Sequence, residues 1–246
     1  MPGFAPNRPR TRQITLAASF AAVYFVLRSV PTFQMVGISS RFTAGDFLLT
    51  SIALLCGLWS GAFSVLIGTV LAYGITPPVF FGLDFLPALV NVALAALLFS
   101  GRHRIAQGIY VTIFLAFILS PYSLMFGFGY VPYTWLHIVA LILLLSPIAA
   151  KIPRWVDSPG LRQIVGIGFP AFVGTLGQHL MGGLLYELAA GFVGGVSPSN
   201  FMNVWRIIFW LYPIERLVIV TLSVFIALAM RRSLRKWFPS QVSSRL

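Results

Sequence analysis

The chain has 246 residues, of which 58% are hydrophobic and only 9% are charged, and its formal net charge is +12. A soluble globular domain averages about 25% charged residues, so this chain has too few polar side chains to cover a water-facing surface. The composition therefore excludes an ordinary soluble protein. It predicts an all-α, polytopic transmembrane helical bundle that forms one domain over residues 14–231, between basic cytoplasmic tails at 1–13 and 232–246.

The basic residues lie in short clusters between apolar runs. The clusters cover residues 8–12, 102–104, 151–162 and 231–236. Cytoplasmic loops of membrane proteins carry such an excess of lysine and arginine. We therefore expect the lipid bilayer, and no nucleic acid, to be the partner of this positive charge.

Residues 14–30 form the first predicted span. Ala17 and Ala21, and likewise Ala18 and Ala22, lie four residues apart. Small residues at this spacing share one helix face and let another helix approach closely. A specific close contact with another helix and ordinary packing inside the bundle both explain the pattern, and both readings stay open.

Residues 31–44 are predicted to form a polar loop, and an apolar stretch of awkward length follows. From Arg41 to residue 75 the only further charge is Asp46. As one helix this stretch would be about 45 Å long and strongly tilted. As two short spans, 45–58 and 60–75, it would turn at Gly57–Gly61. A re-entrant hairpin is the third possibility.

The charge clusters favour a stretch that enters and leaves the membrane. Later spans are predicted at 84–100, 105–126, 134–150, 164–193 and 207–230. With the N-terminus inside, two crossings in 45–75 place every later basic cluster on the cytoplasmic side, as the positive-inside rule requires. A re-entrant hairpin gives the same arrangement. We therefore predict about eight apolar segments in the plasma membrane, with both termini cytoplasmic.

No catalytic signature is present. The sequence lacks an HExxH motif, a GxSxG motif and a phosphate-binding glycine loop, and its three histidines have no metal-site spacing. Cys56 is the only cysteine, which excludes an intrachain disulfide and a cysteine-rich metal site. We expect no enzyme activity, no cofactor and no metal, with an active site built from scattered intramembrane residues as an alternative.

Polar residues inside the apolar segments are the better guide to a site, because they are costly in lipid and tend to face a wet cavity. His179 and Glu187 are eight residues apart, which places them within roughly 80° on one helix face. Gln178 and Glu187 are roughly opposed. Asn91 needs a partner on a neighbouring helix, and Asp46 begins a span, where the helix dipole favours an acid.

The last span carries an adjacent pair of opposite charge, Glu215 and Arg216, just after Pro213. Because adjacent residues do not face each other on a helix, we expect the two to have separate partners. Trp205 lies near a predicted membrane interface, where aromatic residues anchor helices. Stacking on a planar ligand is the alternative role for this ring.

Four segments together resemble a known family. They are a first helix with an alanine face, a polar outer loop ending in an arginine, a short helix pair with a Gly-aromatic-x-Gly turn, and a last helix with Pro-x-Glu-Arg and a basic tail: LAASFAA, SSRFTAGDFLL, GLWSGAFSVLIGT and YPIERLVIVTLSVFIALAMRRSLRK. This pattern resembles the substrate-binding S components of energy-coupling factor (ECF) vitamin transporters. That family has six helices, and residues 105–150 then look like an inserted helical pair.

The resemblance implies a function and a set of residues. The family binds a vitamin or related small molecule from outside and docks on a shared transmembrane coupling protein driven by paired ATPase subunits. The resemblance assigns docking to Ala17, Ala18, Ala21 and Ala22, a lid to loop 31–44, and substrate binding to Arg41, Asp46, Asn91, His179 and Glu187. The run from Trp135 to Pro147 also looks like an eight-helix sensory module of bacterial signalling proteins, which is the second candidate.

Overall fold

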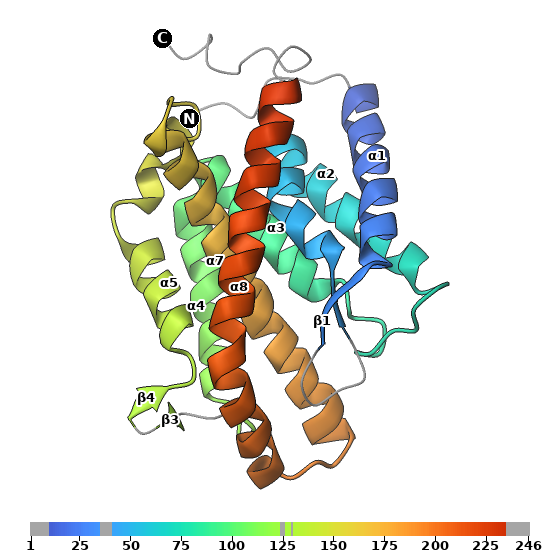
Figure 1. The fold of residues 1–246 in the computed structure, drawn as a ribbon, viewed down its shortest axis with the longest axis vertical. Coiled ribbons are helices and arrows are strands. Elements are labelled where there is room, and N and C mark those ends of the chain that lie inside the picture. The colour runs from blue at the N-terminus through green and yellow to red at the C-terminus, as the bar shows by residue number, and fades with distance from the viewer. Residues whose placement is uncertain (1–9, 35–40, 124–125, 129, 235–246) are drawn as a thin grey trace.

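The computed structural model describes residues 10–34, 41–123, 126–128 and 130–234, so most of the two predicted tails lies outside it. Eight α-helices make up most of the described chain (Figure 1). They are α1 (Arg10–Arg28), α2 (Leu49–Ala72), α3 (Leu86–Phe99), α4 (His103–Ile118), α5 (Trp135–Leu145), α6 (Ile152–Trp155), α7 (Leu161–Tyr186) and α8 (Pro198–Leu234). The all-α prediction is confirmed, with two small β-hairpins added to it.

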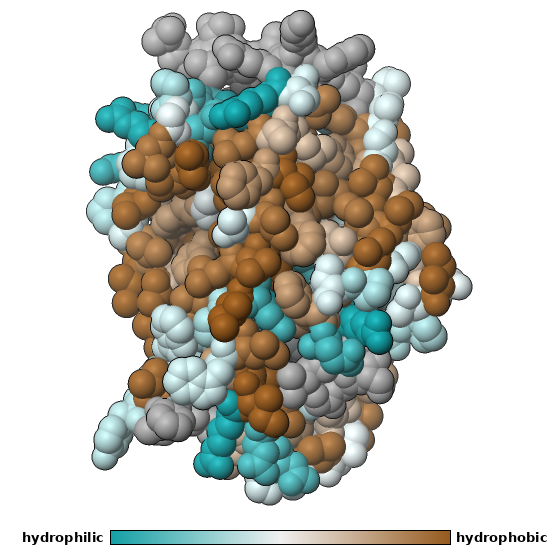
Figure 2. Space-filling view, viewed as in Figure 1, coloured by the Kyte–Doolittle hydropathy of each residue, from teal (hydrophilic) through white to brown (hydrophobic). Residues whose placement is uncertain are grey.

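Within the described part of the chain, three helical segments are long and apolar enough to cross a membrane: Ala44–Ala72, Leu161–Val193 and Pro198–Leu234. A fourth would be the pair Trp135–Leu145 and Ala149–Trp155, which is bent by 60°. Figure 2 shows hydrophobic side chains over the middle of one face, with hydrophilic residues mainly toward its two ends. This surface fits the membrane association that the composition predicts.

The apolar stretch after Arg41 begins with a short 3₁₀ helix, η1 (Ala44–Leu48), and reverses direction inside α2. Gly57 has φ 74° and ψ −167°, which is not helical. A Cβ atom at Gly61 would lie 3.2 Å from Cγ2 of Ile52, although nine residues of straight helix would separate them by about 13.5 Å. The two halves therefore pack against each other, and the turn begins at Gly57 as predicted. By length alone 44–72 passes as one span, but each half is shorter than a standard crossing.

The predicted loop 31–44 is a β-hairpin in its described part. Strand β1 (Pro31–Gln34) pairs antiparallel with β2 (Arg41–Thr43), and the Ala44 amide donates to the Val30 carbonyl over 2.9 Å. The prediction missed these strands because four and three residues are too few to show an alternating pattern. A second hairpin, β3 (Phe126–Phe128) with β4 (Val131–Pro132), follows α4, which ends at Ile118 instead of reaching residue 126 as predicted.

The last two helical segments, α7 with η3 and then α8, begin earlier in the sequence than predicted. The segment after Tyr186 continues as the π-helix η3 (Glu187–Val193), so the long predicted span 164–193 is present. The predicted loop around Pro198 is wrong, because α8 begins there. Proline is tolerated in the first helical turn, where its missing N–H costs no hydrogen bond.

Close helix contacts form the centre of the bundle. A Cβ atom at Gly174 on α7 would lie 2.5 Å from Oδ1 of Asn91 on α3. A Cβ atom at Gly68 on α2 would lie 2.8 Å from the Ala21 carbonyl oxygen on α1. Neither position has room for a side chain, so glycine is what allows these two helix pairs to approach.

The described chain starts and ends at the same end of the bundle (Figure 1). Leu16 near the start of α1 and Leu234 at the end of α8 pack against the same hydrophobic cluster. Basic clusters also lie there. Arg231 donates to the Val156 carbonyl and to the Asp157 carboxylate, so the cluster that begins at residue 231 contacts the cluster at 151–162. Gly101, which precedes the cluster at 102–104, lies against Pro153, because a Cβ atom at Gly101 would be 3.4 Å from Cγ of Pro153. We call this the basic end of the bundle.

Candidate functional site

A cavity of about 160 Å³ lies in the half of the bundle away from the basic end. It is bounded by the last turn of α1, the β1–β2 hairpin, η1, the start of α3, the later part of α7 and the first half of α8. Its polar and charged walls include Arg28, Arg41, Asp46, Gln178, His179 and Arg216. Segments that are far apart in the sequence therefore meet at this one place, between residues 28 and 88 and between residues 178 and 216.

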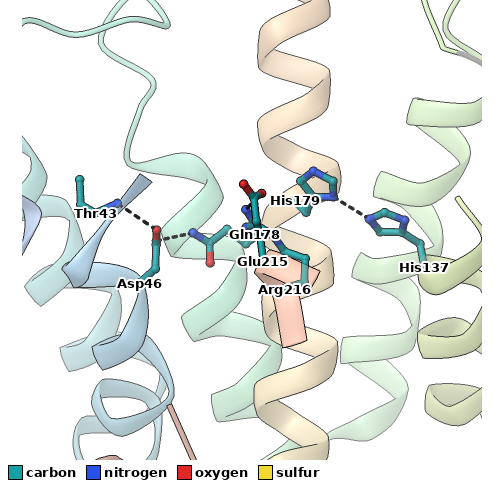
Figure 3. Close-up of polar contacts among 7 residues, drawn as sticks. All are labelled: Thr43, Asp46, His137, Gln178, His179, Glu215 and Arg216. Atoms are coloured by element: carbon teal, nitrogen blue, oxygen red, sulfur yellow. Dashed lines mark hydrogen bonds and ion pairs between the residues drawn. The ribbon is translucent and has the colours of Figure 1, made fainter. Parts of the chain in front are cut away.

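A chain of hydrogen bonds joins four elements at the cavity wall, and Figure 3 shows its part from Thr43 through Asp46 to Gln178. Asn91 on α3 donates through Nδ2 to Oε1 of Gln178 on α7 over 2.7 Å. Gln178 donates through Nε2 to Oδ1 of Asp46 on η1 over 2.6 Å. The Thr43 amide donates to the other carboxylate oxygen of Asp46 over 3.4 Å. These bonds hold Asp46 and Gln178 in fixed positions and satisfy both oxygens of the buried carboxylate.

Arg216 on α8 is the most unusual side chain of the site, because it is fully buried, with 0% of its surface exposed. Its Nη2 lies 3.4 Å from Oε2 of Glu215, and its Cζ lies 4.2 Å from the centre of the Phe42 ring on β2. Nε and Nη1 have no hydrogen-bond partner among the residues that the structure describes. The prediction that Glu215 and Arg216 take separate partners is wrong: the long arginine side chain reaches its neighbour, although only at the outer limit of a hydrogen bond.

A stacked group of rings lies behind the cavity. Nδ1 of His179 on α7 and Nε2 of His137 on α5 are 3.1 Å apart, and both rings stack on Tyr212 of α8. The Tyr212 hydroxyl donates to the Tyr133 carbonyl over 2.9 Å. No local pattern in the sequence predicts this histidine pair, because the two residues are 42 positions apart. Among the described residues no group of three metal-ligating side chains occurs.

Hydrogen bonds to backbone and side-chain atoms hold the residues at the rim of the cavity in place. Arg41 on β2 is exposed and donates through Nε to Oε1 of Gln34 over 3.2 Å. Asp84 accepts hydrogen bonds from the amides of Val79 and Phe80, over 2.9 and 3.1 Å. The Tyr73 hydroxyl donates to the Gly82 carbonyl over 2.8 Å. The rim therefore has a defined shape.

Three of the five predicted substrate-binding residues line the cavity: Arg41, Asp46 and His179. Asn91 lies behind the wall and supports Gln178. Glu187 is elsewhere, where its Oε1 accepts a hydrogen bond from Ser123 over 2.9 Å beside a separate cavity. The predicted shared face with His179 does not make a shared site, because eight residues of helix separate the two by about 12 Å along the axis.

Sequence reasoning left out several side chains of the site. Gln178 was set aside because it opposes Glu187, yet it lines the cavity and Glu187 does not. Arg216 carried a usable signal, since an arginine within an apolar span is a functional candidate by default. Phe42 carried none, because its role depends on which elements meet. Trp205, for which stacking on a planar ligand is the alternative role, does line the cavity.

The four alanines of α1 divide between two faces. Ser64 on α2 donates to the Ala17 carbonyl over 3.0 Å, and Ala21 is buried against Gly68. Ala18 and Ala22 are exposed. Of the predicted docking face, these two residues are the ones that another protein could contact.

Comparisons with protein-family models, with characterised proteins and with solved structures find no match to this chain. The geometry of the cavity therefore carries the functional argument. Its polar groups are fixed by hydrogen bonds, its Arg216 guanidinium has unpaired donors, and apolar side chains complete the wall. Small-molecule sites have this composition, with mostly apolar walls and a few placed polar groups.

Proposed function

We propose that this chain is a membrane-embedded, substrate-binding subunit that captures a small molecule for uptake. The observation that supports it is the cavity of about 160 Å³, where charged and amide side chains gather inside an otherwise apolar bundle. Such groups are costly in lipid and mark substrate pathways. An engineered protein cavity of about 150 Å³ holds one benzene molecule, so the volume suits a ligand with about one ring.

The orientation of the cavity supports capture from outside the cell. The basic clusters meet at the end of the bundle away from the cavity, and the positive-inside rule assigns that end to the cytoplasm. In this arrangement both termini are cytoplasmic and the β1–β2 hairpin, which contributes Arg41 and Phe42 to the wall, lies over the ligand from outside. This is the place of the lid in the S components that the sequence resembles.

Filling the cavity tests the proposal. Gly182 on α7 lines the cavity, and a Cβ atom there would meet nothing within 4 Å. We expect Gly182→Leu to occupy the ligand space without straining the helix, and so to abolish ligand binding while the protein still folds. Native mass spectrometry of the detergent-purified protein measures this as loss of a co-purifying small molecule.

Gly108→Leu is the matched control, because Gly108 is exposed on α4 and its Cβ would also meet open space. This variant should keep the bound molecule at the wild-type level. A small molecule that stays bound to Gly182→Leu, or wild-type protein that never carries one, would contradict the proposed binding site.

The proposal extends to a shared transmembrane coupling protein with ATPase subunits, which would dock on the exposed face of α1. We expect Ala18→Leu and Ala22→Leu to reduce uptake severalfold while ligand binding by the purified protein stays normal, because a bulky side chain prevents close helix approach. Cellular uptake and ligand occupancy are measured side by side, with Gly108→Leu as control. Normal uptake in both variants would refute the docking face.

A sensory module, the other candidate, would show no ATPase partner on co-purification.

A further inference from the structure

The Arg216 guanidinium is a buried charge that the residues described by the structure pair only in part. A buried charge is costly unless it is paired and its donors are bonded. Arg216 has one contact with Glu215 at 3.4 Å and a ring face of Phe42 at 4.2 Å, while Nε and Nη1 are unpaired among the described residues. This side chain lines the cavity, so a ligand in the cavity is within its reach.

Three carboxylates line the cavity, and two of them, Asp46 and Asp84, accept hydrogen bonds from other donors. Asp46 accepts from Gln178 and from the Thr43 amide, one bond to each oxygen. Asp84 accepts from two backbone amides, again one to each oxygen. In the described part of the chain, Glu215 has only its 3.4 Å contact with Arg216. Among the described residues the Arg216 guanidinium, with Nε and Nη1 unpaired, is therefore the lining group with the most unused donors.

We propose that the ligand carries a carboxylate that binds to Arg216, with a compact apolar body against Phe42, Trp205 and Ile208. The inference rests on the proposed binding function and names its ligand class. Guanidinium and carboxylate groups match in shape and form charge-assisted hydrogen bonds about twice as strong as neutral ones. A single negative charge fits better than a phosphate dianion, because the carboxylates of Asp46 and Glu215 line the same cavity and Glu215 already lies 3.4 Å from Arg216.

Three fluorinated probes of nearly the same size test the proposal on wild-type protein. They are 4-fluorobenzoate, the neutral 4-fluorobenzamide and the dianionic 4-fluorophenyl phosphate, and binding to the full chain in detergent is measured by ¹⁹F NMR. We expect the benzoate to bind at least about 10-fold more tightly than the amide, and more tightly than the phosphate. This comparison uses only wild-type protein, so it does not depend on the folding of a variant.

Substitution then assigns the effect to one side chain. Arg216→Gln should weaken 4-fluorobenzoate binding by about 10- to 150-fold, the range expected for losing hydrogen bonds to a charged group, and leave the amide nearly unchanged. Arg206→Gln is the matched control, because Arg206 lies on the same helix but is exposed. It should bind the benzoate as wild type does.

Each other outcome overturns the inference. Equal affinity for benzoate and benzamide, binding of no probe, or normal benzoate binding by Arg216→Gln would refute the Arg216 anchor. Tighter binding of the phosphate would refute the single-charge carboxylate. The Gly182→Leu variant separates this failure from failure of the proposed function: if it loses a probe that Arg216→Gln retains, the cavity binds ligand and only the anchor is wrong.

Discussion

Replacing Gly174 with alanine is expected to lower the free energy of unfolding by about 1–3 kcal/mol, the usual cost of overpacking a tight core. The new Cβ atom would lie 2.5 Å from Oδ1 and 3.0 Å from the backbone carbonyl oxygen of Asn91. A side chain could rotate away, but the backbone oxygen can move only if α3 and α7 separate. Thermal unfolding of the detergent-purified protein, followed by tryptophan fluorescence, measures the loss.

Gly174→Ala should also change the shape of the cavity wall, because Asn91 donates the hydrogen bond that positions Gln178, which in turn donates to Asp46. We therefore expect weaker ligand binding together with lower stability. Gly168→Ala on the same helix is the control: its Cβ would make an ordinary contact of 3.6 Å with Cγ2 of Val224. If Gly174→Ala were as stable as Gly168→Ala, the close approach of α3 and α7 at this point would be incorrect.

Replacing Gly57 with alanine is expected to cost about 1–3 kcal/mol through backbone strain. Its φ of 74° with ψ of −167° lies in a region that is essentially restricted to glycine. A Cβ atom makes these backbone angles unfavourable in any residue other than glycine. Because no atom lies within 4 Å of the Cβ position, the expected loss of stability comes from the backbone conformation and not from crowding by neighbouring side chains. A lower unfolding temperature measures the strain.

Gly108→Ala provides the opposite control, since Gly108 is exposed within α4 and alanine is the better helix former by about 1 kcal/mol. That variant should be as stable as wild type or more so. If Gly57→Ala were equally well tolerated, the two halves of α2 would form a continuous helix instead of a reversed pair. The awkward length of the apolar stretch would then be explained by tilt.

The sequence alone determined the features that depend on local composition and periodicity. Apolar content and scattered charge predicted a helical membrane protein, and the long span ending near Val193 was found because its apolar run is continuous. The turn at Gly57 was also predictable, because glycines interrupt the apolar stretch there. In each case neighbouring residues contain the whole signal.

Only the tertiary structure decided which polar side chains share a site. Gln178 meets Asp46 and Asn91 from positions 132 and 87 residues away, and His179 meets His137 across 42 residues. Helical periodicity gives the angle of a side chain on its own helix, but not its depth or the helix that it faces. That is why Glu187 was expected beside His179 although it lies two turns further along.

Arg216 combines both kinds of information. The sequence showed an arginine within an apolar span, which is costly in lipid and therefore needs a purpose. The fold decided that Arg216 is buried beside Phe42 in the wall of a cavity, with two of its donors unpaired among the residues that the structure describes. These properties arise where η1, α7 and α8 meet, because burial and pairing depend on neighbours that no stretch of sequence contains.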